Sequence, residues 1–84
     1  MINTFVITTK YVIDNKSPVL TVYKDEDGDW QFFGGEIDIL EEDASVVSLV
    51  EMLNLDPSLG NILWIGNGMK ATRASISDEW VTHV

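Results

Sequence analysis

Acidic side chains that recur from Asp25 onward are the residues of this sequence best placed to do chemistry. Carboxylates at Asp25, Asp27 and Asp29, followed by Glu36, have the spacing of the oxygen ligands in a calcium-binding loop. Trp30, however, stands where such a loop needs a glycine for its sharp turn, and the flanking residues predict strands where helices belong. We therefore interpret the segment as a negatively charged hairpin turn and expect neither a metal ligand nor a cofactor.

The chain offers little for nucleophilic catalysis. It has no cysteine, and its single histidine, His83, lies next to the C-terminal residue, where chains fray. A serine nucleophile needs a base held within hydrogen-bond reach, and a fraying end is a poor place to hold one. We predict no catalytic residue and favour a protein that is not an enzyme. Two alternatives stay open: a small carboxylate-dependent enzyme or cation-binding domain that uses the acids between Asp25 and Glu36, and a passive oligomerisation or accessory domain.

The charge is strongly negative and unevenly placed. The formal net charge is −9, and residues 25–43 contain many acids but no lysine or arginine. A field of this sign repels nucleic acid and anionic lipid and attracts basic proteins. We therefore expect a basic protein as partner, and neither nucleic acid nor a membrane. Acids that serve only to keep a small protein soluble are the alternative interpretation.

The three tryptophans offer either core packing or a contact surface. Core packing is the ordinary fate of an indole in a small domain. Trp30, however, follows the acidic turn, and Trp80 stands beside Asp78 and Glu79. An exposed indole rimmed by acids makes a binding hot spot for a basic partner. The candidate partner surface therefore consists of six residues: Asp25, Asp27, Asp29, Trp30, Arg73 and Trp80.

Arg73 is the only arginine of the chain. Lysine serves solubility equally well, so an arginine favours a pairing that uses the planar fork of the guanidinium. We expect an ion pair with Asp29 or Glu36. The alternative is a lone solvated cation.

The first part of the chain predicts strands. Residues 5–13 alternate in type, and their odd positions offer the more apolar face. Residues 19–23 are β-branched and aromatic, and the turn that includes Gly28 leads into a strand over 29–33, with Trp30 and Phe32 on one face. These segments predict an antiparallel meander.

Two short helices are predicted further along. Ser48 and Glu51 have the spacing of a capping box, which indicates a helix over about 49–54. Asp56 as N-cap and Pro57 at the first helical position predict a second helix that runs to about Trp64.

The remaining segments complete the predicted fold. Residues 44–47 favour a short strand, residues 69–75 a last one, and Trp80 is expected to fold back on the core. We therefore predict a single α+β domain over residues 1–84, with an antiparallel sheet of four or five strands and two short helices on one face.

Several segments together resemble a family of small bacterial proteins, some of whose relatives are grouped with immunity proteins that neutralise toxins. They are residues 25–32, which hold the Asp-Gly-Asp-Trp-Gln-Phe segment, residues 46–49, residues 56–59, and Gly68, Ala71, Arg73 and Trp80. The chain departs from the family before Gly68, where members carry Leu-Pro and this sequence has Gly66-Asn67. The family has no settled activity, so the resemblance implies a bacterial cytosolic domain more than a function.

Location and function follow from these observations as expectations. The absence of cysteine, of a signal-peptide pattern and of a long apolar run predicts a cytoplasmic protein. We predict a small, acidic, non-enzymatic binding domain, an immunity-type or regulatory protein that engages a basic protein partner.

Overall fold

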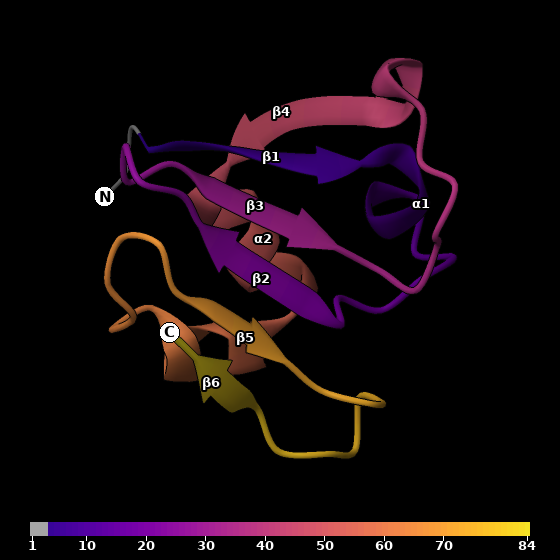
Figure 1. Ribbon diagram of the computed structural model, residues 1–84. Coiled ribbons are helices and arrows are strands. Elements are labelled where there is room, and N and C mark those ends of the chain that lie inside the picture. The colour runs from indigo at the N-terminus through magenta and orange to yellow at the C-terminus, as the bar shows by residue number, and fades with distance from the viewer. Residues whose placement is uncertain (1–3) are drawn as a thin grey trace.

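The computed structural model describes residues 4–84 and contains one six-stranded sheet. The strands, in chain order, are β1 (Phe5–Thr9), β2 (Thr21–Lys24), β3 (Trp30–Phe33), β4 (Ala44–Ser48), β5 (Lys70–Thr72) and β6 (Val81–His83). The helical elements are α1 (Lys10–Ile13), η1 (Glu41–Asp43), α2 (Leu49–Leu55) and η2 (Pro57–Ile62), of which η1 and η2 are 3₁₀ helices. Figure 1 looks onto the sheet, with α2 behind it.

The order of strands across the sheet is β4-β1-β3-β2-β5-β6. The α+β class is confirmed, but the expectation of four or five antiparallel strands is wrong on two points. The sheet has six strands, and β1 pairs with β3 in parallel, with Ile7 opposite Gln31. The parallel pair arises because β3, and not β2, lies beside β1: β2 runs opposite to both of these strands, so β1 and β3 run in the same direction. β6 has only three residues, too few to show an alternating pattern.

The first strand is shorter than predicted and faces the other way. It ends at Thr9, whose hydroxyl accepts a hydrogen bond from the Val12 amide (3.4 Å) and caps α1. Val6 is buried, whereas Phe5 is 67% exposed, so the even positions face the core. The odd side chains are larger and more apolar, but the helices that supply the core lie on the opposite side of the sheet.

The β2–β3 hairpin is confirmed. Gly28 has φ +87°, a conformation that a side chain disfavours, which explains a glycine in this turn. Trp30 and Phe32 lie on one face, as predicted, with ring centroids 6.0 Å apart, and both are buried.

The two predicted helix starts are also confirmed. The Ser48 hydroxyl accepts from the Glu51 amide (3.1 Å) at the start of α2, and the Asp56 carboxylate accepts from the Ser58 amide (3.0 Å) at the start of η2. The second helix is a 3₁₀ helix that ends at Ile62, short of Trp64. The helices α2 and η2 form a helical layer on one side of the sheet, and one hydrophobic core lies between the two. Its residues are Val6, Val12, Val19, Val22, Trp30, Phe32, Leu49, Met52, Leu59, Ile62, Ile65 and Ala71.

Candidate functional site

The six predicted surface residues do not form one patch. Asp25, Asp27 and Asp29 lie in the β2–β3 turn, whereas Arg73 follows β5 at the end where Thr72 pairs with the first residue of β2. Trp30 is only 8% exposed, because it packs in the core beneath the hairpin, so its expected place in an exposed patch is wrong.

Asp25 organises the acidic turn. Its Oδ1 accepts hydrogen bonds from the amides of Asp27 and Asp29, both at 2.9 Å, and its Oδ2 accepts from Gln31 (3.4 Å). Glu36 lies elsewhere, where it accepts a hydrogen bond from Ser17. Over residues 4–84 no three His, Cys, Asp or Glu side chains gather in a way that would hold a metal ion. The turn therefore presents Asp27 and Asp29 to solvent, while Asp25 fixes its shape.

Arg73 is buried and paired, but with a residue that the sequence did not suggest. Its Nη2 lies 2.6 Å from Oδ2 of Asp56, its Nη1 donates to Ser58 (3.0 Å) and its Nε donates to the Val19 carbonyl (3.0 Å). The expectation of Asp29 or Glu36 as partner is wrong: Asp29 lies in the β2–β3 turn, at the opposite end of β2, and Glu36 accepts a hydrogen bond from Ser17 instead. The sequence predicts Asp56 only as a helix cap, but its carboxylate both caps η2 and pairs with Arg73.

The environment of Asp56 sets its charge. Burial alone would raise the pKa of this carboxyl, but hydrogen bonds from Ser58 and Arg73 outweigh burial and hold the pKa below its usual range. The carboxylate is therefore charged at neutral pH and neutralises the guanidinium. This pair fixes the position of Arg73 under the sheet.

Trp80 folds back on the core, as predicted, and stacks on Arg73. The guanidinium carbon lies 4.2 Å from the ring centroid, which is close enough for a cation–π interaction. The indole Nε1 is buried and finds no hydrogen-bond partner among residues 4–84.

A row of side chains crosses the side of the sheet that the helices leave uncovered. The strand registers place its members directly opposite one another from β4 to β6: Val46, Ile7, Gln31, Tyr23, Lys70 and His83. Phe5, on β1, and Phe33, on β3, occupy the same side, since their neighbours in the strand are buried. We call these eight residues the open face.

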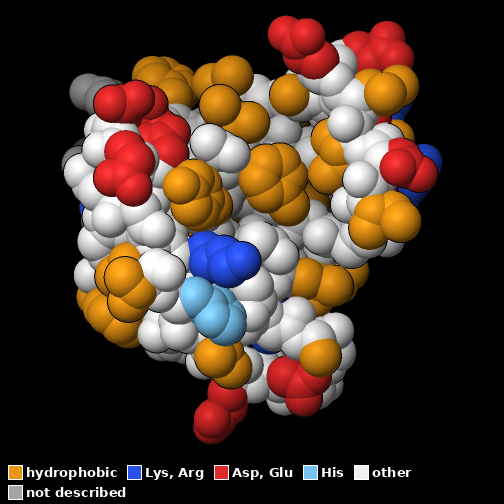
Figure 2. All heavy atoms as spheres, in the orientation of Figure 1, with side chains coloured by type: hydrophobic (Ala, Val, Ile, Leu, Met, Phe, Trp, Pro, Cys, Tyr) orange, Lys and Arg blue, Asp and Glu red, His pale blue; other side chains and the backbone are white. Residues whose placement is uncertain are grey.

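The open face combines an apolar centre with a charged border. Figure 2 shows hydrophobic side chains over the middle of this side, next to a lysine and the histidine, with Asp and Glu side chains at the left, top and bottom of the view. Val46 is 70% exposed and Ile7 38%, so the centre is accessible. This arrangement of an apolar core and a polar rim is the usual anatomy of a protein–protein interface.

A cavity of about 460 Å³ lies beneath the β6 end of the sheet. We call it the indole cavity, because Trp64 and Trp80 both line it, together with Arg73, Asp78 and Glu79. Thr82 also lines it, and this residue pairs with the buried Ala71, so the cavity opens on the helix side and not on the open face.

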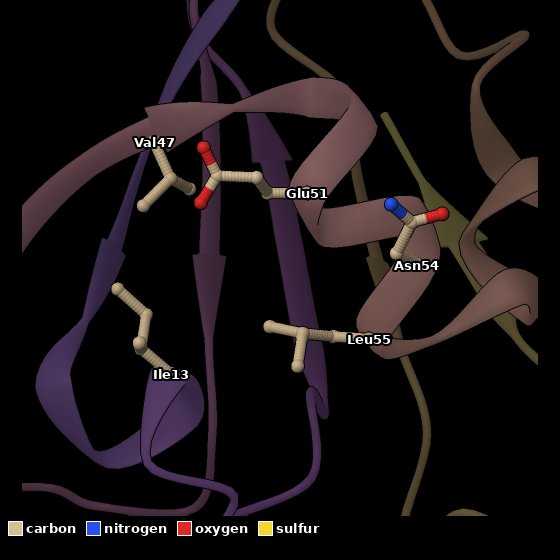
Figure 3. A pocket seen from close by; sticks show the side chains of 5 residues that line it. All are labelled: Ile13, Val47, Glu51, Asn54 and Leu55. Carbon is tan, nitrogen blue, oxygen red and sulfur yellow. The ribbon is translucent and has the colours of Figure 1, made fainter.

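A smaller hollow of about 280 Å³ lies between α1, β4 and α2. Figure 3 shows Leu55 directed toward Ile13 and the Glu51 carboxylate extending toward Val47, whereas Asn54 stands apart. Many carboxylate enzymes use two carboxylates whose pKa values are pushed apart, whereas Glu51 supplies the one carboxylate among the residues that line this hollow. Its aliphatic walls suit packing better than chemistry.

Comparison of the chain with protein-family models, with curated proteins and with solved structures finds no match. The resemblance to an immunity-type family stays a prediction. None of the helices within residues 4–84 combines the length and apolar character needed to cross a membrane.

Proposed function

We propose that this chain is a small non-enzymatic binding domain, of immunity or regulatory type, that docks a basic protein on its open face. The observation that carries the proposal is the apolar centre of the open face within a border of carboxylates (Figure 2). The helices of residues 4–84 pack on the other side of the sheet, so no helix covers these apolar side chains.

The apolar centre supports the affinity of such a complex. Ile7 and Val46 lie opposite each other, and Tyr23 and Phe33 add partly exposed aromatic rings on neighbouring strands. Aromatic and aliphatic side chains near the middle of an interface carry most of its binding energy when water is excluded from them.

The charge distribution supports a basic partner. The chain carries a net charge of −9, and Asp27 and Asp29 are exposed in the turn between β2 and β3, two strands that contribute to the open face. Complementary charges at the rim raise the association rate and reject acidic proteins. A nuclease toxin that must bind phosphate presents a field of the required sign, which agrees with the immunity-type resemblance.

The test begins with a defined partner. A gene for a basic toxin beside the gene for this chain supplies one; otherwise a captured protein is identified by mass spectrometry and purified. Calorimetric titration should then show binding that weakens as salt rises, because rim charges are screened. Binding that is indifferent to ionic strength would contradict the basic-partner proposal.

A matched pair of variants locates the interface. Val46→Lys places a charge on the open face and should weaken binding at least about tenfold, since an unpaired ammonium must be desolvated. Val50→Lys makes the same change on α2, behind the sheet, and should leave Kd within about a factor of two. Equal effects of the two variants would place the partner elsewhere.

A further inference from the structure

The indole cavity has the composition of a site for an organic cation. Trp64 is 67% exposed, an unusual state for so large an apolar ring, and Trp80 lines the same cavity. The volume of about 460 Å³ falls within the range of roughly 300–1,000 Å³ that is usual for ligand sites.

The charge that faces the cavity is negative. Arg73 lines it, but Asp56 neutralises this guanidinium at 2.6 Å. Asp78 and Glu79 also line it, and neither takes part in the two ion pairs formed within residues 4–84. A turn in which Ser75 donates to the Asp78 carboxylate (3.0 Å) holds one of these acids in place.

We propose that the indole cavity receives an arginine side chain displayed by another protein. The guanidinium lies over the Trp64 indole and donates hydrogen bonds to Asp78 and Glu79, while the aliphatic stem lies against Ile76. This site lies on the helix side of β6, away from the open face, so it does not depend on the proposed function.

The molecule already contains the same interaction once. Arg73 stacks on Trp80 at 4.2 Å and pairs with Asp56 at 2.6 Å, which combines an indole and a carboxylate around one guanidinium. Arginine fits this chemistry better than lysine, because its planar group both stacks on an aromatic face and offers a fork of donors to carboxylates.

The test is an NMR titration of the full-length ¹⁵N-labelled chain with Nα-acetyl-arginine amide. The three tryptophans give three indole N–H signals. Those of Trp64 and Trp80 should shift in a saturable manner, while that of the buried Trp30 stays in place as an internal reference. The matched probe, Nα-acetyl-norleucine amide, has an aliphatic side chain without the charge and should shift neither signal.

Variants separate the site from general electrostatics. Asp78→Asn with Glu79→Gln should raise the Kd of the arginine probe at least about fivefold, and Trp64→Ala should do the same. Asp27→Asn with Asp29→Asn removes the same amount of charge from the acidic turn and should leave the Kd within about a factor of two. The unchanged Trp30 signal reports that each variant is folded.

Three results would overturn the proposal: equal shifts with the norleucine probe, equal weakening by the two charge-removing pairs, or binding that survives Trp64→Ala. If Val46→Lys leaves the Kd of the arginine probe unchanged, the indole cavity acts independently of docking at the open face. Conversely, if Val46→Lys abolishes binding of the partner but the arginine probe does not bind the wild type, the proposed function stands and the indole cavity is rejected as a site.

Discussion

The guanidinium of Arg73 lies 2.6 Å from the carboxylate of Asp56. This ion pair links Arg73, which directly follows β5, to Asp56, the N-cap residue of η2. The side chain of Arg73 is 2% exposed and that of Asp56 14%, so the pair lies largely out of water. The same guanidinium holds Trp80 by stacking, and the same carboxylate caps η2. One ion pair therefore joins the sheet, the helical layer and the C-terminal strand.

Removal of one partner of this pair should be strongly destabilising. Arg73→Met leaves the Asp56 carboxylate buried without its cation, and we expect a loss of about 3 kcal/mol in the free energy of unfolding. The measurement is urea denaturation followed by tryptophan fluorescence. Lys70→Met, which removes an exposed cation from the open face, is the control and should change stability by less than about 0.5 kcal/mol.

A double-mutant cycle checks that the loss comes from the pair. Arg73→Met combined with Asp56→Leu should cost clearly less than the sum of the two single changes, because neither charge is then left alone. Arg73→Lys gives a milder second comparison that keeps the charge but loses the fork. Additive losses in the cycle would show that the two side chains are not coupled.

Stability should fall in acid because two carboxylates have lowered pKa values. For Asp43, a hydrogen bond from the Leu40 amide and then one from Lys10 lower the pKa; for Asp56, hydrogen bonds from Ser58 and Arg73 outweigh burial. A group whose pKa is lower in the folded state contributes stability above its unfolded pKa, about 4 for Asp. That contribution is lost as the pH falls below about 4 and through the folded pKa values.

The melting temperature measured from pH 7 down to pH 2 tests this expectation. The wild type should lose stability mainly below about pH 4, and Asp43→Asn should be less stable at pH 7 but show a shallower decline in acid, since it no longer takes up that proton. A decline of unchanged steepness in this variant would mean that Asp43 does not contribute to the acid response.

The capping serine of α2 provides a smaller and sharper test. Ser48→Ala removes the acceptor for the Glu51 amide at 3.1 Å, and we expect a loss of about 1 kcal/mol in the free energy of unfolding. Ser77→Ala, at an exposed position outside any helix, is the matched control and should be nearly neutral. Similar effects of the two changes would mean that the cap contributes little to α2.

Local chemistry explains which elements the sequence predicted. Gly28 identified the β2–β3 turn, and Ser48 and Asp56 identified two helix starts, because each signal depends on residues that are neighbours in the chain. Thr9 is a similar local signal, because it is the N-cap of α1. The alternation of apolar and polar residues continues past Thr9, however, and predicts a longer strand. The elements whose signals were local were thus largely predictable.

The failed predictions depended on long-range packing. The apolar character of Phe5 and Ile7 predicts that they belong to the core, but the side of a strand that is buried depends on where the helices pack. The parallel pairing of β1 with β3 likewise results from the path of the intervening chain. Arg73 and Asp56 are separated by 17 positions, and no spacing rule joins them.

The exposure of Trp64 in the indole cavity is the feature that the sequence indicates least. Trp64 looked like the end of an amphipathic helix, and its exposure became visible only when η2 ended at Ile62. Asp78, Glu79 and Trp80 are consecutive in the sequence, whereas the cavity that they share with Trp64 depends on the fold.

Gly60 and Gly68 differ in backbone conformation and in the space around them. Gly68 has φ +82°, and a Cβ there would lie 2.5 Å from Oε1 of Glu26. At Gly60, φ is not positive, and a Cβ would meet no atom of the described residues within 4 Å beyond its chain neighbours and the backbone of its own helix. Gly68→Ala should therefore lower the free energy of unfolding by about 1–2 kcal/mol, since the conformation is strained and Glu26 must move. Gly60→Ala should be neutral or slightly stabilising, because alanine restricts the unfolded chain and fits the 3₁₀ helix. The measurement is thermal unfolding of both variants under the same conditions. If Gly60→Ala loses as much stability as Gly68→Ala, the backbone conformation of Gly68 is not the cause of the loss.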